Sequence, residues 1–301
     1  MRLLRTSALL LMAGAALLTS CSVDDIFEGK EENITIKDKI SGTLTVDEPY
    51  ADYAACFEAS EPTTVDPIRN FRAIDFLPDG TCLILSEKSI WTTYDVAQGE
   101  IYRFQYGNEG EGTVRKNVLT MTDYQTGNIN HITLTKVEAS PTATTARLCH
   151  TWQLQQGIVK MYDGKKLMMT ERLEDDEVEI DEERFLSFTP AGNCIAYQQF
   201  EWGGNIGTWQ WTSEQNQQLS YTFVNDMGGG NVTTTTSNVT VYFAGNNLYV
   251  EKEMTMDEYN GEDYDPDHGY ENPDYDYDED IESRCDRVVT LYKYEVKASI
   301  E

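Results

Sequence analysis

The residues Phe76-Leu77-Pro78-Asp79-Gly80-Thr81-Cys82 recur 112 positions later as Phe188-Thr189-Pro190-Ala191-Gly192-Asn193-Cys194. Each copy places a Pro-x-Gly turn between residues that favour strands. Proline presets the first φ of such a turn, and glycine adopts the positive φ that β-branched residues avoid. Each copy therefore predicts two strands joined by a tight turn. The repetition indicates that the chain contains two copies of one β fold.

Three further pairs of segments match in the same order along the chain. They are 42–46 with 150–154, 112–114 with 207–209, and 133–138 with 290–295. The order of the segments persists while their spacing differs, which indicates that the loops differ in length. We therefore predict a first domain at 32–140, a linker at 141–145 and a second domain at 146–301, with an acidic insert at 257–283.

The residues around these matches have the pattern of β-strands. Gly207-Thr208-Trp209-Gln210-Trp211-Thr212 alternates, so that both tryptophans lie on one face of a strand. Residues 238–243, 247–250 and 288–296 are runs of β-branched and aromatic residues bounded by turn-forming or polar residues. No helical period of useful length follows residue 20. The predicted fold class is all-β.

The second copy shows a family resemblance. Its motifs are Thr151-Trp152, Leu186-Ser187-Phe188-Thr189-Pro190-Ala191-Gly192, Gly207-Thr208-Trp209-Gln210-Trp211, Val239-Thr240-Val241 and Leu248-Tyr249-Val250. Together they resemble the lipocalin-like domain of bacterial lipoproteins. Lipocalins favour glycine two residues before the first-strand tryptophan, where this chain has His150, while the first copy keeps Gly42 but has Leu44 in place of tryptophan. The resemblance implies an antiparallel barrel of about eight strands.

The fold expected for the whole chain is therefore two tandem antiparallel lipocalin-like barrels, or half-barrels, with up-and-down connectivity. A barrel of this size either holds one small ligand or is filled by its own side chains. The residues that would line a cavity for a small apolar ligand are Trp152, Trp209, Trp211, Tyr221 and Phe223. The alternative, in which these aromatic side chains only fill the core, stays open at this point.

The N-terminal residues predict export and lipidation. Arg2 and Arg5 precede an apolar run at 8–18, which is shorter than the roughly 20 residues that cross a membrane and is typical of a signal peptide. Leu18-Thr19-Ser20-Cys21 resembles the lipobox of bacterial lipoproteins. We expect cleavage after residue 20, acyl chains such as palmitate on Cys21, and a tether at 21–31. The alternative is an ordinary signal peptide.

The residues that follow Cys21 bear on location. Ser22 is not the residue associated with retention in the inner membrane, so we expect anchoring in the outer membrane. Val23-Asp24-Asp25 resembles a short acidic signal that sends some lipoproteins to the cell surface, although a plain polar tether has the same composition. The leaflet that the protein faces is left open.

The charge of the chain restricts its partners. It carries 52 acidic and 23 basic residues, a formal net charge of -29, so nucleic acid is not an expected partner. Thirteen acids and no Lys or Arg lie within 257–283. Alternating carboxylates suit calcium, which prefers six to eight oxygen ligands. The predicted calcium ligands are Asp263, Asp265, Asp267 and Asp274, and the alternative is a solvated loop that binds no metal.

Catalytic motifs are missing from the sequence. The three histidines form no HExxH, and there is no GxSxG, phosphate-binding glycine loop or SxxK. Five cysteines remain after Cys21, which is an odd number, and the sequence selects no disulfide pairing among them. These are Cys56, Cys82, Cys149, Cys194 and Cys285. We predict that the protein is not an enzyme.

Two functions fit these features. The first is a lipid-anchored outer-membrane or surface lipoprotein whose barrels bind a small apolar ligand or a surface partner. The second is a cell-surface adhesion or assembly protein with a cation-binding acidic loop and no ligand cavity.

Overall fold

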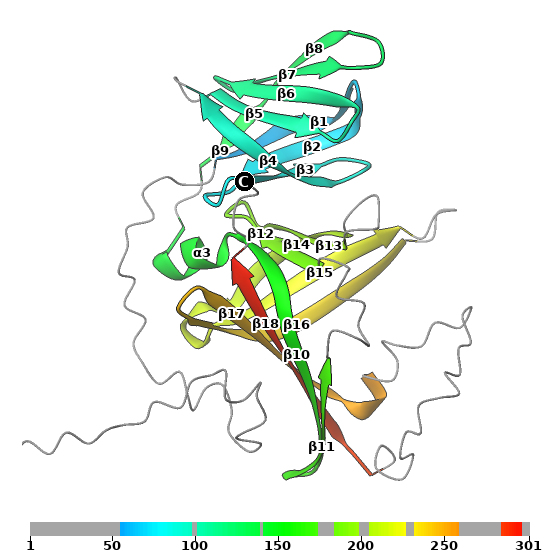
Figure 1. The fold of residues 1–301 in the computed structure, drawn as a ribbon, viewed down its shortest axis with the longest axis vertical. Helices are drawn as coiled ribbons and strands as arrows, with labels where there is room; N and C mark the ends of the chain where they lie inside the picture. Colours follow the sequence, from blue (N-terminus) through cyan, green and yellow to red (C-terminus); the bar gives the residue numbers. More distant parts are fainter. Residues whose placement is uncertain are drawn as a thin grey trace, which may run out of the picture.

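The computed structural model describes residues 55–97, 101–138, 141–173, 184–198, 205–226, 232–258 and 284–296. Two antiparallel β-barrels follow one another along the chain, as the sequence predicts (Figure 1). The described residues also form a short helix, α3 (Ala143–Leu148), and one 3-10 turn, η1 (Glu214–Asn216).

The first barrel is a sheet in which each strand pairs with the next along the chain. The final strand is divided at Leu134: its first part pairs with β7 and its second part pairs with β1, which brings the last strand back to the first. The strands are β1 (Ala55–Val65), β2 (Ile68–Phe76), β3 (Thr81–Leu85), β4 (Ile90–Ala97), β5 (Ile101–Tyr106), β6 (Gly110–Arg115), β7 (Val118–Asp123), β8 (Ile129–Thr133) and β9 (Thr135–Val137).

The second barrel closes fully, because β18 pairs with β10 from Trp152 opposite Val296 to Tyr162 opposite Arg287. The first part of β10 pairs with β12 and its second part with β11, so β11 and β12 together take the place that β2 has in the first barrel. The strands are β10 (Thr151–Asp163), β11 (Lys166–Leu173), β12 (Arg184–Phe188), β13 (Asn193–Gln198), β14 (Asn205–Ser213), β15 (Gln218–Asp226), β16 (Val232–Ala244), β17 (Asn247–Thr255) and β18 (Arg287–Val296).

The repeated turn has the same structure in both barrels. Phe76 ends β2 opposite Cys82, and Phe188 ends β12 opposite Cys194; all four side chains are buried. Gly80 and Gly192 have φ of 83° and 85°. Position 77 and its counterpart 189 each accept a hydrogen bond from the glycine N–H, at 3.2 and 3.0 Å. The predicted equivalence of the two turns is confirmed.

Two of the other predicted matches are wrong in detail. The strand after the repeated turn carries Tyr94 in the first barrel and Trp209 in the second, and their N–H groups donate to Gly80 and Gly192. The counterpart of 207–209 is therefore 92–94 on β4, not 112–114 on β6. The two segments look alike in sequence because each has a glycine that packs against an aromatic ring. Gly112 and Gly207 nevertheless lie on strands that do not correspond.

The first-strand match is also wrong, because a different residue takes the position of Trp152 in the first barrel. Trp152 pairs with Leu186, and the residue in the same position of the first barrel is Phe57, which pairs with Ile74. The segment 42–46 lies outside the described residues. By contrast, 133–138 and 290–295 do belong to the last strand of each barrel, in a shifted register.

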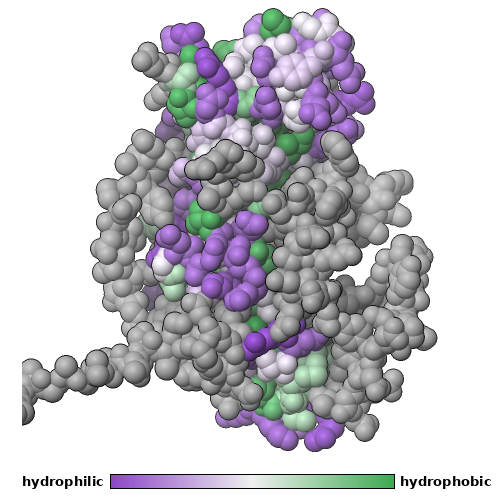
Figure 2. Space-filling model, in the orientation of Figure 1, coloured by the Kyte–Doolittle hydropathy of each residue, from purple (hydrophilic) through white to green (hydrophobic). Residues whose placement is uncertain are grey.

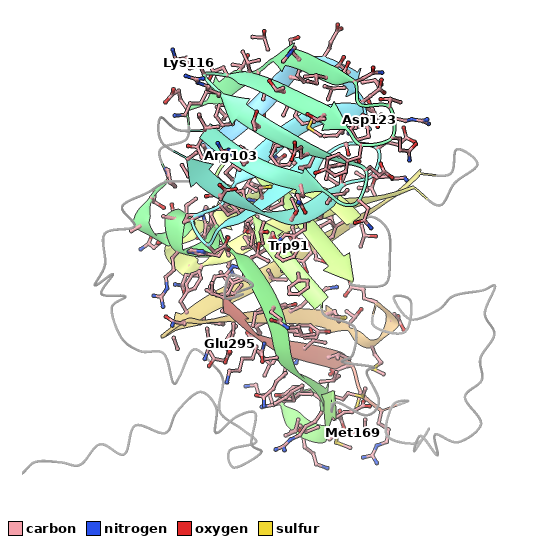
Figure 3. All side chains as sticks on the ribbon, turned by 45° about the horizontal axis from the view of Figure 1, so that its top comes forward. Trp91, Arg103, Lys116, Asp123, Met169 and Glu295 are labelled. Carbon is pink, nitrogen blue, oxygen red and sulfur yellow. The ribbon has the colours of Figure 1, made fainter. Side chains whose placement is uncertain are left out.

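The two barrels share an apolar interface. Outward-facing residues of β2 and β3 pack against β13, and the ring of Trp91 stacks on that of Phe185 with centroids 5.3 Å apart (Figure 3). The buried members of this cluster are Ala73, Leu77, Leu83, Leu85 and Ile195. The interface therefore uses the outer faces of both barrels and leaves their interiors separate.

Polar side chains in the interface are paired across it. The N–H of Thr151 donates to Asp79 Oδ2 at 2.6 Å, and Thr151 Oγ1 lies 2.8 Å from Thr81 Oγ1. In the other direction, Asn193 Nδ2 of the second barrel donates to Asp75 Oδ2 of the first at 3.0 Å. Each repeated turn therefore contacts the first strands of the opposite barrel, and the interface has approximate twofold symmetry.

Candidate ligand site in the second barrel

One end of the second barrel is closed by α3. The helix begins at Thr142, whose Oγ1 accepts from the N–H of Thr145. Leu148 lies in the barrel core, and its carbonyl accepts from Trp152 Nε1 at 2.8 Å. Arg147 lies over the ring of Phe243 and donates to a backbone carbonyl of the β16–β17 turn. The helix therefore forms the floor of this barrel.

Trp152 and Trp209 fill the part of the interior nearest to α3. They are 2% and 8% exposed, and the indole N–H of Trp209 donates to the carbonyl of Thr189 at 2.9 Å. Phe188 packs edge-on against Trp209, with ring centroids 5.7 Å apart. Two of the five predicted ligand residues are thus core residues with satisfied indole groups.

The other three predicted residues are only half-buried. Trp211, Tyr221 and Phe223 pack against the core cluster from neighbouring strands. Tyr221 is the cross-strand partner of Trp209, and its ring centroid lies 5.3 Å from that of Phe223. Trp211 lies near the floor, where its Nε1 donates to Thr145 Oγ1 at 2.9 Å. Tyr221 and Phe223 therefore lie farther from the floor than Trp211.

Two aromatic residues that the sequence analysis missed belong to the same site. Tyr292 and Tyr294 on β18 are half-buried and pack against the same core cluster. Their alternation in the run at 288–296 was the available signal. Small interior residues adjoin the aromatic ones: Ser237 is the cross-strand partner of Tyr221, and Gly207 is that of Phe223. The part of the interior farther from α3 therefore combines aromatic rings with small side chains.

The first barrel also has half-buried aromatic residues beside its core, Tyr94 and Tyr102, but their rings pack on the buried ring of Phe76. The buried apolar side chains of this core are at most 4% exposed and include Phe76, Phe104 and Tyr106. A Cβ on Gly112 would lie 2.2 Å from the ring of Phe104. The end opposite the repeated turn is closed by short turns, and Tyr106 Oη donates to the carbonyl of Lys88 there. The described interior of this barrel is filled.

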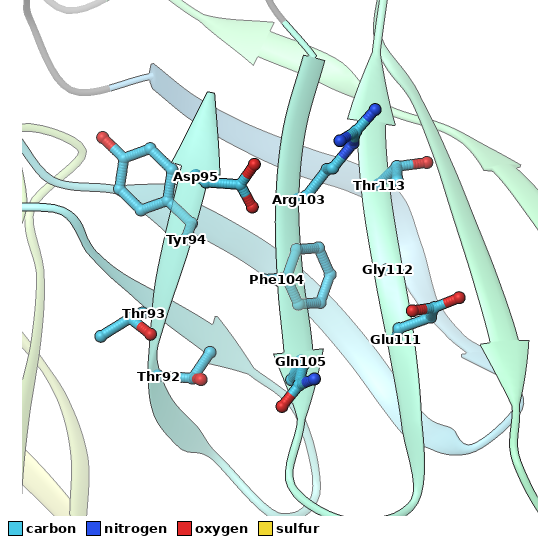
Figure 4. Close-up of a pocket in the computed structure, with 10 residues that line it drawn as sticks. All are labelled: Thr92, Thr93, Tyr94, Asp95, Arg103, Phe104, Gln105, Glu111, Gly112 and Thr113. Atoms are coloured by element: carbon cyan, nitrogen blue, oxygen red, sulfur yellow. The ribbon is translucent and has the colours of Figure 1, made fainter. Parts of the chain in front are cut away.

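A groove of about 590 Å³ lies instead in the wall of the first barrel. β4 pairs with β3 up to Thr93 and with β5 from Tyr94 onward, so it bends away from β5 (Figure 4). The groove is lined mainly by polar side chains, among them Asp95, Arg103 and Glu111. The corresponding strand β14 pairs with β15 from Ile206 to Ser213, and this wall of the second barrel is closed.

All five described cysteines are buried. Cys56, Cys82, Cys149 and Cys194 form no disulfide. Burial raises the pKa of each of these thiols, to about 12 for Cys194. Thiolates are the nucleophilic form of cysteine, so these four side chains act as small apolar residues.

Asp75 is an acidic side chain that is completely buried in the interface between the barrels. Burial raises the pKa of this carboxyl, while hydrogen bonds from Asn193, Thr189 and Cys56 lower it in part. Its Oδ1 has no hydrogen-bond partner. Through its hydrogen bond from Asn193, Asp75 links the first barrel to the second.

Some predicted sites lie outside the described residues. These are the lipidation residue Cys21 and the calcium ligands Asp263, Asp265, Asp267 and Asp274. Within the described part of the chain, no group of three or more His, Cys, Asp or Glu side chains is arranged to hold a metal ion. No described helix has the length and apolar character needed to cross a membrane.

Comparison of the chain with protein-family models, curated proteins and solved structures finds no match. The lipocalin-like resemblance therefore stays a prediction based on the motifs, and the function has to be argued from the site itself.

Proposed function

We propose that the protein is an exported lipoprotein, anchored in the outer membrane through Cys21, whose second barrel binds one small apolar ligand. The observation that supports this function is a set of half-buried aromatic side chains that pack against the core of a closed barrel. These are Trp211, Tyr221, Phe223, Tyr292 and Tyr294. Ligand sites are typically concave and lined by aromatic and apolar groups with a few polar ones, which is the composition of this interior.

The closed floor and the filled first barrel support the same proposal. α3 and Trp152 block one end of the second barrel, so a ligand would enter from the opposite end, where Tyr221 and Phe223 lie. Because the described interior of the first barrel is packed, we assign it a supporting role. It holds the second barrel through the shared interface.

A titration with a fluorescent fatty-acid analogue tests the proposal. Phe223 faces the interior, whereas the next residue, Val224, points outward and is 48% exposed. We expect Phe223→Ala to weaken probe binding and Val224→Ala to leave it unchanged. The two variants remove apolar area from opposite faces of the same strand, so the comparison separates the interior from the surface.

If the wild-type protein binds no apolar probe, the proposal is wrong. The alternative function, adhesion or assembly at the cell surface, would then be favoured. The polar groove between β4 and β5 is the feature that supports it.

A further inference from the structure

A cluster of methionines lies beyond the second barrel, on the strands that extend from its open end. It contains five of the nine methionines in the chain. Val159, Val288 and the thiol of Cys285 complete it. The methionines are Met161, Met168, Met169, Met254 and Met256. Figure 3 places Met169 at the end of the molecule farthest from the first barrel.

The pairing of four strands brings the thioethers together. Met254 on β17 lies opposite Val288 on β18, which lies opposite Met161 on β10, which in turn lies opposite Met169 on β11. Directly opposite residues have Cβ atoms about 4.5–5.5 Å apart. The register of β10 and β11 shifts beside Met161, so Met168 is an extra residue at the same point. Met161 and Met169 are therefore direct neighbours, and Met254 lies on the same face, two strands from Met161 across Val288.

Met161 and Met254 are buried, at 1% and 7% exposed, and the cluster reaches the surface at its other end. A groove of about 410 Å³ beside Met254 is lined by Glu253, Glu258, Asp286 and Arg287, and Arg287 pairs with Glu253. Met168 and Met169 are only partly buried, and Figure 2 shows hydrophobic surface at this lower end, over β11. The net charge of -29 favours the approach of a cation.

A second observation points to a ligand. Thr290 lies on β18 opposite Val159, two residues from Val288, and therefore on the same face as the cluster. The residue is 3% exposed, and its hydroxyl oxygen has no hydrogen-bond partner. Buried polar groups are normally paired, so the position beside the cluster has room for a polar partner of the Thr290 hydroxyl.

We propose that this cluster binds a soft monovalent cation, copper(I). Thioether and thiolate sulfur select copper(I) among biological metals, whereas calcium and magnesium require oxygen ligands. A cluster that served only for packing would be formed equally well by leucine, which is similar in volume and has fewer rotatable bonds. The ligands are drawn from Met161, Met169 and Met254, with Met168, Met256 and Cys285 beside them.

Competition with the chromophoric chelator bicinchoninate tests the proposal on the full-length protein. The wild type should withdraw one copper(I) per chain from the chelator. A triple variant, Met161→Leu, Met169→Leu and Met254→Leu, keeps the side-chain volumes and should weaken binding more than about tenfold, since even outer-shell partners are worth about 10- to 100-fold. Met121→Leu, a buried methionine of the first barrel, is the matched control and should bind like the wild type.

Either absence of copper(I) binding by the wild type or equal binding by the triple variant would overturn the proposal. A second measurement avoids dependence on the folding of that variant. Silver(I), which has the same preference for sulfur, should shift the methyl NMR signals of the cluster methionines and leave that of Met121 in place. Shifts confined to other residues, or no shifts, would also overturn it.

This proposal does not depend on the apolar ligand. The triple leucine variant should lose copper(I) and keep fatty-acid binding, whereas Phe223→Ala should do the reverse.

Discussion

The carboxyl of Asp75 lies completely buried where the two barrels meet. Burial raises its pKa above the ordinary value of 3.8, so the fold favours the neutral acid. Its contribution to stability is complete below pH 3.8 and is lost as the pH rises through the folded-state pKa. Asp75→Asn removes this loss. We expect the melting temperature of the variant to exceed that of the wild type increasingly as the pH rises.

At low pH the two proteins should melt at similar temperatures, because both then carry a neutral side chain at position 75. Thermal unfolding measured by circular dichroism from pH 3 to pH 9 checks this. A difference in melting temperature that does not change with pH would show that the effect of the substitution is not electrostatic.

Trp209 tests the distinction between core and ligand site at one residue. It is 8% exposed and hydrogen-bonded to the carbonyl of Thr189. Trp209→Ala should therefore lower the free energy of unfolding by about 3–5 kcal/mol, as expected for a large core side chain. Urea denaturation gives this value. A loss below about 1 kcal/mol would show that Trp209 lines an empty space.

The sequence identified the interior aromatic residues but not their different roles. Trp209 and Trp211 were found by alternation along β14, because alternation determines which face a residue takes. It does not determine depth along the barrel axis. That depends on strand register and on α3, whose six residues were too few to give a helical period.

At the scale of elements, Gly112 shows how closely neighbouring strands pack. A Cβ at this position would lie 2.2 Å from the ring of Phe104 and 2.6 Å from the sulfur of Met121. Gly112→Ala should destabilise the protein by about 1–3 kcal/mol through overpacking. Phe104→Leu in the same protein should recover part of this loss, because the smaller side chain leaves room for the new methyl group.

Urea denaturation of the two single variants and the double variant measures this coupling. If the two losses simply add, Phe104 is not the residue that excludes a side chain at position 112.

The repeated turn was predictable because its cause is local. Proline and glycine determine the backbone of the turn, so both copies could be recognised from seven residues. The match that involved Gly112 failed because glycine in a strand indicates a nearby ring or backbone and not a particular strand. The interface between the barrels was not predictable, since Asp75, Trp91 and Phe185 come together only when both barrels have formed.

Calcium binding by the acidic insert at 257–283 remains a prediction. If Asp263, Asp265, Asp267 and Asp274 bind calcium, then calcium should raise the melting temperature. The expected stabilisation is about 2.7 kcal/mol when the free ion is a hundredfold above its dissociation constant. Replacing the four aspartates by asparagine should abolish the shift, which calorimetry with and without calcium measures. An equal shift in the variant would exclude these ligands.

For the whole molecule, the first expectation concerns the membrane. Cys21→Ala removes the sulfur that would carry the lipid, and a protein without acyl chains has no strong membrane anchor. We expect the variant to appear in the soluble fraction after cells are broken in high salt. A variant that still sediments with the membranes would contradict lipid anchoring through this residue.

We propose that the second barrel binds one small apolar ligand and that the filled first barrel binds none. Native mass spectrometry of the full-length protein with an added long-chain fatty acid tests it directly. We expect a single bound fatty acid per chain at saturation, and none for a chain in which Phe223 and Tyr221 are replaced by alanine. No bound fatty acid, or two per chain, would contradict it.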